Sequence, residues 1–140
     1  MRLALEEARL AFDECEVPVG AVLVRNGEVI ARAHNRVEQT GDATAHAELL
    51  CLREAMERLG PRLTDCTLFV TLEPCAMCAG ACVNSKLSRL VFGAFEEAAG
   101  CCGSKMDLTD HCFLHSVETW GGILEPECKK LLTNFFQALR

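Results

Sequence analysis

The dipeptide Asn26-Gly27 stands between two apolar runs, residues 19–25 and residues 28–34. Both central positions of a tight two-residue hairpin turn need a positive φ, which Asn and Gly adopt more easily than other residues. The sequence therefore predicts an antiparallel β-hairpin near the start of the chain.

Strands and helices alternate in the rest of the chain. Apolar residues at helical spacing predict an amphipathic helix over residues 2–15, before the hairpin. The later segments are expected to be a helix over 45–59 with Thr44 as its cap, a strand over 67–72, a helix over 75–85, a strand over 89–93, a short strand over 117–119 and a last helix that starts at Pro126. This order predicts one α/β domain over residues 1–140, with helices packed on the faces of a mixed sheet.

The charge of the chain limits its partners. Fourteen basic and twenty acidic residues give a net charge of −6, so any nucleic acid must bind a local basic patch. The longest charge-free stretch, residues 74–85, is too short to span a bilayer, and early charges interrupt any signal peptide. We therefore expect no membrane contact and a cytoplasmic, reducing location.

Ten cysteines in 140 residues is a high number. Without signs of secretion, a disulfide framework is not expected. Five of the cysteines fall within apolar patterns and are predicted to be buried, inert thiols: Cys15, Cys51, Cys66, Cys82 and Cys128. Cys101 and Cys102 lie in a glycine-rich loop, and the sequence gives them no role.

Cys75 and Cys78 have the spacing of a metal-binding pair. Residues three apart share one face of a helix, and the positive end of a helix favours thiolate over thiol. His46 also stands at the start of a predicted helix and can complete a set of three ligands. Two thiolates and an imidazole in a tetrahedral array select zinc. Three protein ligands leave one position open for water, as in catalytic sites, so we expect one catalytic zinc ion per chain.

Glu48 follows His46 by two residues, which makes it a poor ligand for the same ion but allows it to face the open position. A carboxylate beside a zinc-bound water acts as a general base. Alternatives exist for each residue alone: a redox pair, a core histidine or a solvated carboxylate. The main structural rival makes Cys82 a fourth ligand, which would turn the centre into a purely structural site.

The spacing His-x-Glu…Pro-Cys-x-x-Cys is the signature of zinc-dependent nucleobase deaminases. Five longer segments resemble bacterial tRNA-specific adenosine deaminases in detail: residues 16–22, 44–48, 70–81, 91–94 and 103–104. The similarity extends from Arg2 to the last helix. The chain therefore resembles the tRNA branch of this superfamily over nearly its whole length.

The resemblance implies a three-layer α-β-α fold with a mixed five-stranded sheet, and a homodimer. It implies hydrolytic deamination of the wobble adenosine of a tRNA anticodon to inosine, with arginine tRNA of anticodon ACG as the expected partner. It assigns zinc to His46, Cys75 and Cys78, and proton transfer to Glu48. The substrate contacts that it implies are Asn35 on the purine, the backbone N–H of Ala47 on the base, and further contacts from Pro74 and Glu96.

Three departures from the family pattern affect the grip on tRNA rather than the chemistry. Phe95-Glu96 stands where the family has Arg-Asp, Cys101-Cys102 replaces small residues, and the chain ends at Arg140 without a longer basic tail. The remaining candidates for phosphate contacts are Lys86, Arg89, Lys105 and Arg140. Two rival functions stay open: a deaminase of a free base or nucleoside such as guanine or cytosine, and a zinc-stabilised binding module without catalysis.

Overall fold

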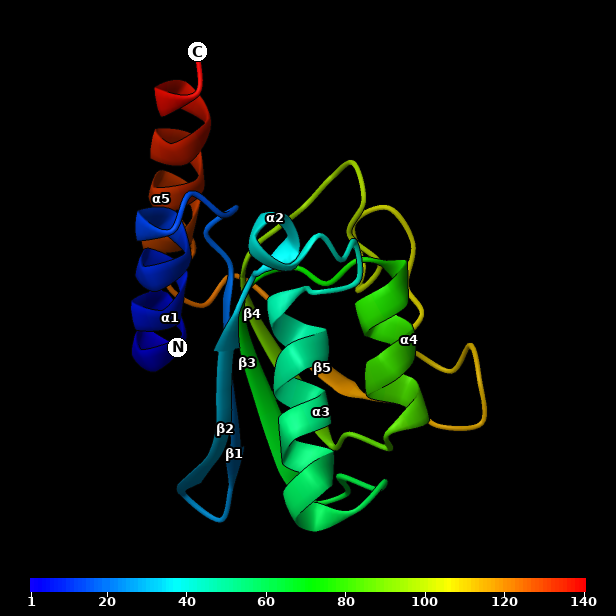
Figure 1. The fold of residues 1–140 in the computed structure, drawn as a ribbon. Coiled ribbons are helices and arrows are strands. Elements are labelled where there is room, and N and C mark those ends of the chain that lie inside the picture. Colours follow the sequence, from blue (N-terminus) through cyan, green and yellow to red (C-terminus); the bar gives the residue numbers. More distant parts are fainter.

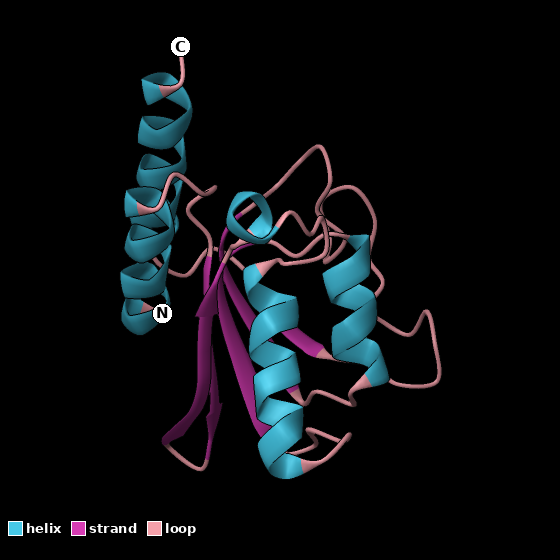
Figure 2. Ribbon diagram, in the orientation of Figure 1, coloured by secondary structure: helices cyan, strands magenta, loops and turns pink.

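A mixed sheet lies between two layers of helices in the computed structural model, which describes residues 1–140 (Figure 1). Helices α1 (Arg2–Asp13) and α5 (Glu125–Ala138) cover one face of the sheet, and both chain termini lie on that side. Helices α3 (Ala47–Leu59) and α4 (Ala76–Asn84) cover the other face (Figure 2). The structure confirms the expected three-layer α-β-α architecture.

Five strands form the sheet in the order β2-β1-β3-β4-β5. Their bounds are β1 Gly20–Arg25, β2 Glu28–His34, β3 Cys66–Leu72, β4 Arg89–Ala94 and β5 Glu118–Trp120. Strand β1 is antiparallel to both β2 and β3, whereas β3–β4 and β4–β5 are parallel pairs. Every strand except β1 therefore runs in the same direction. Their carboxyl ends meet at one edge of the sheet, where ligands bind in open α/β folds.

The hairpin at Asn26-Gly27 is confirmed. Both residues have positive φ, 52° and 77°, and the flanking residues Arg25 and Glu28 pair directly across the strands. This local signal fixes β1 and β2, and β1 in turn pairs with β3 on its other edge.

The two helical layers pack differently on the sheet. The main core lies between the sheet and the layer of α3 and α4, with fully buried residues such as Leu52, Leu68 and Leu90. On the other face, glycines let the helices come close to the strands. A Cβ at Gly20 would lie 2.0 Å from the Ala4 carbonyl oxygen of α1, and one at Gly93 would lie 2.3 Å from a sulfur of α5.

The structure corrects several details of the sequence expectations. Cys15 is exposed and has a left-handed backbone (φ 62°) just after α1, because it belongs to the turn rather than to the apolar face. Thr44 does not cap α3; its hydroxyl donates to Asp42, and His46 takes the N-cap position.

A short helix, α2 (Val37–Thr40), was not expected. Glu16 is only 1% exposed, and its carboxylate accepts the backbone N–H groups of Glu38 and Gln39 at the start of α2.

The other cysteines follow the expectation more closely. Cys51, Cys66, Cys82 and Cys128 are buried, and so are Cys101 and Cys102, which join the main core. This burial gives the unexplained Cys101-Cys102 pair a packing role. None of the helices has the length and apolar character needed to cross a membrane.

Candidate metal centre and active site

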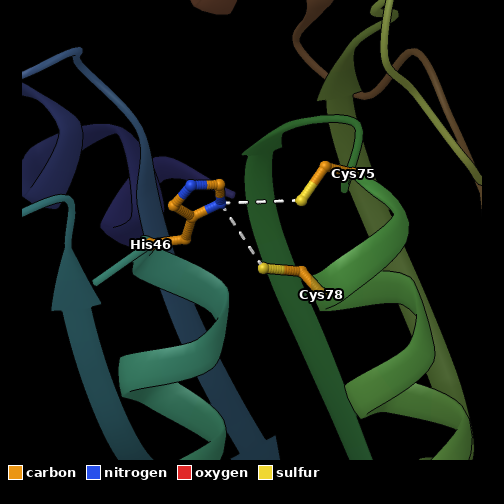
Figure 3. Close-up of side chains that lie close together, drawn as sticks. All are labelled: His46, Cys75 and Cys78. Atoms are coloured by element: carbon orange, nitrogen blue, oxygen red, sulfur yellow. Dashed lines mark hydrogen bonds between the residues drawn. The ribbon is translucent and has the colours of Figure 1, made fainter. Parts of the chain in front are cut away.

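The N-terminal ends of α3 and α4 lie side by side and bring three metal-ligating side chains together (Figure 3). His46 is the N-cap of α3, and Cys75 is the N-cap of α4. The sulfurs of Cys75 and Cys78 lie 3.6 Å and 3.7 Å from the same ring nitrogen, Nδ1 of His46. The predicted ligand cluster is therefore present in the folded chain.

These separations fit a tetrahedral zinc ion. With Zn–S bonds of about 2.3 Å and Zn–N bonds of about 2.0–2.1 Å, two ligand atoms of a tetrahedron are roughly 3.6 Å apart. The observed sulfur–nitrogen distances agree with this value. Two sulfurs and one imidazole nitrogen are also the donor set that zinc prefers over hard cations.

The thiol of Cys75 is prepared for metal binding. A hydrogen bond from Cys78, supported by backbone N–H groups at the start of α4, lowers the pKa of the Cys75 thiol to about 5. The same contact with Cys75, together with burial, raises the pKa of the Cys78 thiol. Cys75 is therefore the thiol of the pair that favours the thiolate form, which is the form that coordinates metal.

Cys82 is not a fourth ligand. The ligand atoms that lie together come only from His46, Cys75 and Cys78. Cys82 is fully buried in the apolar core, and burial raises the pKa of its thiol. The structure therefore brings three protein ligands together, which is the number that catalytic zinc sites use, whereas structural sites use four.

Glu48 lies in the first turn of α3 and is 4% exposed. Its side chain lines the same pocket as His46 and Cys75. Burial raises the pKa of the Glu48 carboxyl. A carboxyl group buried beside the three ligand side chains is placed to exchange a proton with a ligand in this pocket.

The pocket has a volume of about 350 Å³, near the lower end of the roughly 300–1,000 Å³ typical of small-ligand sites. Part of its wall comes from the carboxyl ends of three strands: Asn35 follows β2, Glu73 follows β3, and Glu96 comes two residues after β4. The parallel direction of these strands explains why residues so distant in the sequence meet here.

Asn35 and Ala47 are bonded to each other. The backbone N–H of Ala47 donates to Oδ1 of Asn35 at 2.8 Å, and Asn35 is 9% exposed. The expectation that the Ala47 N–H holds a base is therefore not supported, because that N–H is already occupied. The amide nitrogen of Asn35 forms no hydrogen bond within the protein. Every fully buried polar side-chain atom does form one, so the amide nitrogen of Asn35 is accessible to solvent. It is the group that Asn35 can offer to a ligand in the pocket that it lines.

Pro74 and Glu96 have different positions. Pro74 is buried and does not line the pocket; its carbonyl accepts the Cys101 N–H at 2.8 Å. The structure therefore does not place Pro74 in contact with a ligand in the pocket, and it connects Pro74 instead to the loop that follows β4. Glu96 lines the pocket as expected, and its carboxylate also accepts the Ala98 N–H at 3.0 Å.

Sequence reasoning missed Glu73, which organises that loop. Glu73 is only 2% exposed. Its carboxylate accepts the backbone N–H groups of Glu96, Cys102 and Ser104 at 3.0–3.1 Å. The hydroxyl of Ser104 donates to it as well. A carboxylate placed between a buried strand and a proline was the available signal. Glu73 thereby fixes the wall of the pocket that carries Glu96.

Replacing Glu73 with Ala should destabilise the protein. Four donors would lose a buried charged acceptor, so we expect the free energy of unfolding to fall by about 3 kcal/mol and the melting temperature by roughly 10 °C. Thermal denaturation measures this. The matched control is Glu97→Ala, because Glu97 is an exposed carboxylate of the same loop without a hydrogen bond. Equal melting temperatures for the two variants would contradict the assigned role of Glu73.

The fold and this ligand set define a zinc-dependent deaminase. The profile of the cytidine and deoxycytidylate deaminase zinc-binding region matches residues 1–94, and the chain belongs to this family of hydrolytic enzymes. The relatives specify the branch. A tRNA-specific adenosine deaminase of Bacillus subtilis is 51% identical over all of this chain and 88% of its own length. The corresponding Aquifex aeolicus enzyme is 43% identical over all of this chain and 93% of its own length.

Solved structures share this fold. The chain superimposes on a structure from studies of A-to-I editing by tRNA:A34 deaminases with a TM-score of 0.86 and 42% identity, covering 94% of this chain and 97% of the other. A guanine deaminase from Nitrosomonas europaea shares the fold with a TM-score of 0.84 at 24% identity, over 96% of this chain and 81% of that one.

Proposed function

We propose that this chain, as a single deaminase domain over residues 1–140, deaminates the wobble adenosine of a tRNA anticodon to inosine. One observation carries the proposal: a three-ligand metal centre and a buried carboxylate share a pocket of about 350 Å³, large enough for a purine. The relatives named tRNA-specific adenosine deaminase support the choice of adenosine in tRNA over other substrates of the family. Arginine tRNA with anticodon ACG is the substrate that we expect.

The pocket selects a base rather than a phosphate. Four glutamates line it: Glu16, Glu48, Glu73 and Glu96. Their negative charges repel phosphate oxygens but do not repel a neutral base. A base in a single-stranded loop reaches such a pocket at little cost, because it is not held in a duplex.

The chemistry is hydrolysis: adenosine and water give inosine and ammonia. His46, Cys75 and Cys78 would hold the zinc ion, which would make a water nucleophile available at neutral pH. Glu48 would take one proton from the attacking water and deliver it to N1 of the purine. It would then take the second proton of that water from the new C6 hydroxyl and pass it to the amino group, so that ammonia leaves and the C6 oxygen becomes the carbonyl of inosine. The amide nitrogen of Asn35 donates to the purine, while its Oδ1 stays bonded to Ala47.

A kinetic comparison tests this function. The purified protein is incubated with an ACG anticodon stem-loop and, separately, with free adenine, guanine and cytosine. We expect deamination of the stem-loop only. Rapid deamination of a free base with none of the stem-loop would replace the proposal by a free-base deaminase on the same fold.

The role of Asn35 can be separated from its backbone bond. Asn35→Asp keeps the acceptor for Ala47 but loses the amide donor, whereas Asn35→Ala loses both. We expect kcat/KM on the stem-loop to fall about 10- to 100-fold in both variants, with the salt dependence unchanged, because no phosphate contact is lost. Steady-state kinetics over a salt series measure this. Wild-type activity of Asn35→Asp would limit Asn35 to supporting the backbone.

Phosphate contacts require basic side chains that the protein itself leaves free. Arg89 is bonded to Glu118 at 3.1 Å, whereas Lys86, Lys105 and Arg140 form no ion pair. The latter three are the candidates that remain for the RNA backbone. Cytoplasmic tRNA as the substrate also agrees with the ten free cysteines, which fit a reducing compartment.

The protein is further proposed to be a homodimer. Phe113 and Leu114 are 57% and 105% exposed, beside a hollow of about 570 Å³ at the end of α4 that Gly80 and Asn84 also line. Small residues on α4 let a second copy come close. Light scattering should give about twice the chain mass of 15.3 kDa, and Leu114→Asp should shift the protein to monomer.

The control for this test is Leu139→Asp, because Leu139 is also largely exposed (68%) but lies at the end of α5. This variant should remain dimeric. A wild-type mass of one chain at micromolar concentration would contradict the dimer.

A further inference from the structure

Phe95 lines a hollow that adjoins the deaminase pocket through Glu96. It follows β4 directly and precedes Glu96, which lines the pocket. The Phe95 side chain is 51% exposed, although it is a large apolar group next to a polar cavity. Neither the metal centre nor the proton transfers use it. Its exposure at this place therefore needs another explanation.

The ring of Phe95 is held in place from within the protein. It packs edge-to-face with Phe92, with ring centroids 5.1 Å apart and an interplanar angle of 89°. Gly122 lies against it, since a Cβ added there would be 3.5 Å from Cε2 of Phe95. The Gly122 N–H donates to Gly93 at 3.1 Å, which ties this segment to β4. The exposed part of the ring is thus a fixed surface and loses little entropy when a ligand covers it.

A second hollow opens beside the pocket and shares Glu96 with it. Its volume is about 800 Å³, and its lining residues are Phe95, Glu96, Glu97, Ser104, Glu125 and Lys129. Three carboxylates against one ammonium disfavour phosphate groups here. An aromatic ring accepts the flat face of any base, and the carboxylates can accept hydrogen bonds from base amino groups.

We propose that Phe95 is a stacking surface for the nucleobase that neighbours the target adenosine in the RNA loop. This proposal rests on the proposed function, because it needs an RNA loop as substrate. When the target base enters the pocket, the adjacent base is unstacked at the rim. Unpaired loop bases are commonly bound by stacking on aromatic side chains. Phe95 replaces the lost stacking and so binds the substrate outside the reacting centre.

The direct test is the kinetics of Phe95→Ala on the stem-loop. Base-on-aromatic stacking of the usual strength predicts a rise in KM of roughly 5- to 150-fold, with kcat nearly unchanged. Phe95→Tyr and Phe95→Trp should keep the wild-type KM, because they keep an aromatic face. Trp120→Ala is the matched control: Trp120 is 56% exposed, and its pairing with Val91 places it on the opposite face of the sheet from Phe92.

Stem-loops with an abasic site on either side of the target adenosine separate stacking from a structural effect. If Phe95 stacks on a neighbouring base, the wild type should have a raised KM for one of these two substrates. Phe95→Ala should not raise the KM for that substrate any further. An equal effect of Phe95→Ala on all three substrates, or no effect on any, would overturn the stacking role while the wild type still deaminates the stem-loop. Failure of the wild type on the intact stem-loop would instead overturn the proposed function and the stacking role with it.

Discussion

Glu48→Ala protein is expected to keep its fold and its zinc and to turn over the stem-loop at least a thousandfold more slowly than the wild type. General acid–base groups typically contribute 10²- to 10⁴-fold, and a residue that serves several proton transfers belongs near the top of that range. Glu48 is also buried in the pocket, where bulk water cannot easily replace it as a proton carrier. The measurements are kcat on the stem-loop and zinc content per chain.

Two comparisons make the result specific. Glu48→Gln keeps the shape of the side chain and should be as inactive as Glu48→Ala, because it cannot accept the proton. Glu57→Gln changes an exposed glutamate of the same helix and should leave kcat unaltered. Retention of a tenth of the wild-type kcat in either Glu48 variant would remove Glu48 from the proton-transfer role.

Loss of one metal ligand should have an equally large effect. Cys75→Ala leaves two of the three ligands, so we expect zinc to be lost on purification and stem-loop turnover to fall to the background rate. The melting temperature should fall as well, since an ion that binds only the folded state stabilises it. Metal analysis and thermal denaturation measure these changes.

Cys82→Ala is the matched control for this prediction. Cys82 lies one turn after Cys78 in α4 and is buried in the core. This variant should keep one zinc ion per chain and its activity, and lose only stability. Zinc loss from Cys82→Ala would restore a four-ligand, structural centre and contradict the open position.

Local signals explain how much of the fold could be predicted from the sequence. The hairpin at Asn26-Gly27 depends on two adjacent residues, and both have the positive φ that their types favour. Cys75 and Cys78 are separated by less than one helical turn, so a metal pair could be predicted from spacing alone. His46 could be added because it opens a helix, as Cys75 does.

The contacts that shape the pocket depend on tertiary structure and were not predicted. Glu16 accepts an N–H group of α2 that lies 22 residues further along the chain. Glu73 accepts an N–H group of the loop after β4 that lies 29 residues further along. The position of Glu73 between a buried strand and a proline was a local signal for that residue, but no local pattern shows which distant N–H groups these carboxylates accept. The bond between Asn35 and Ala47 belongs to the same class, and it changed the expected role of the Ala47 N–H.

The edge of the sheet explains why the remaining site residues meet. Asn35, Glu73 and Glu96 come close only because β2, β3 and β4 run in the same direction and end at the same level. That direction follows from the antiparallel position of β1 between β2 and β3. The sequence predicts each strand by its apolar pattern, but the strand order requires the folded chain.

The most direct test of the account is sequencing of an ACG anticodon stem-loop after incubation with the zinc-loaded protein. Inosine is copied as guanosine, so deamination should change the base reported at the first anticodon position and at no other adenosine of the loop. The Glu48→Ala protein should leave that position as adenosine under the same conditions. An unchanged wobble base with the wild-type protein, while a free base is deaminated in parallel, would contradict the account.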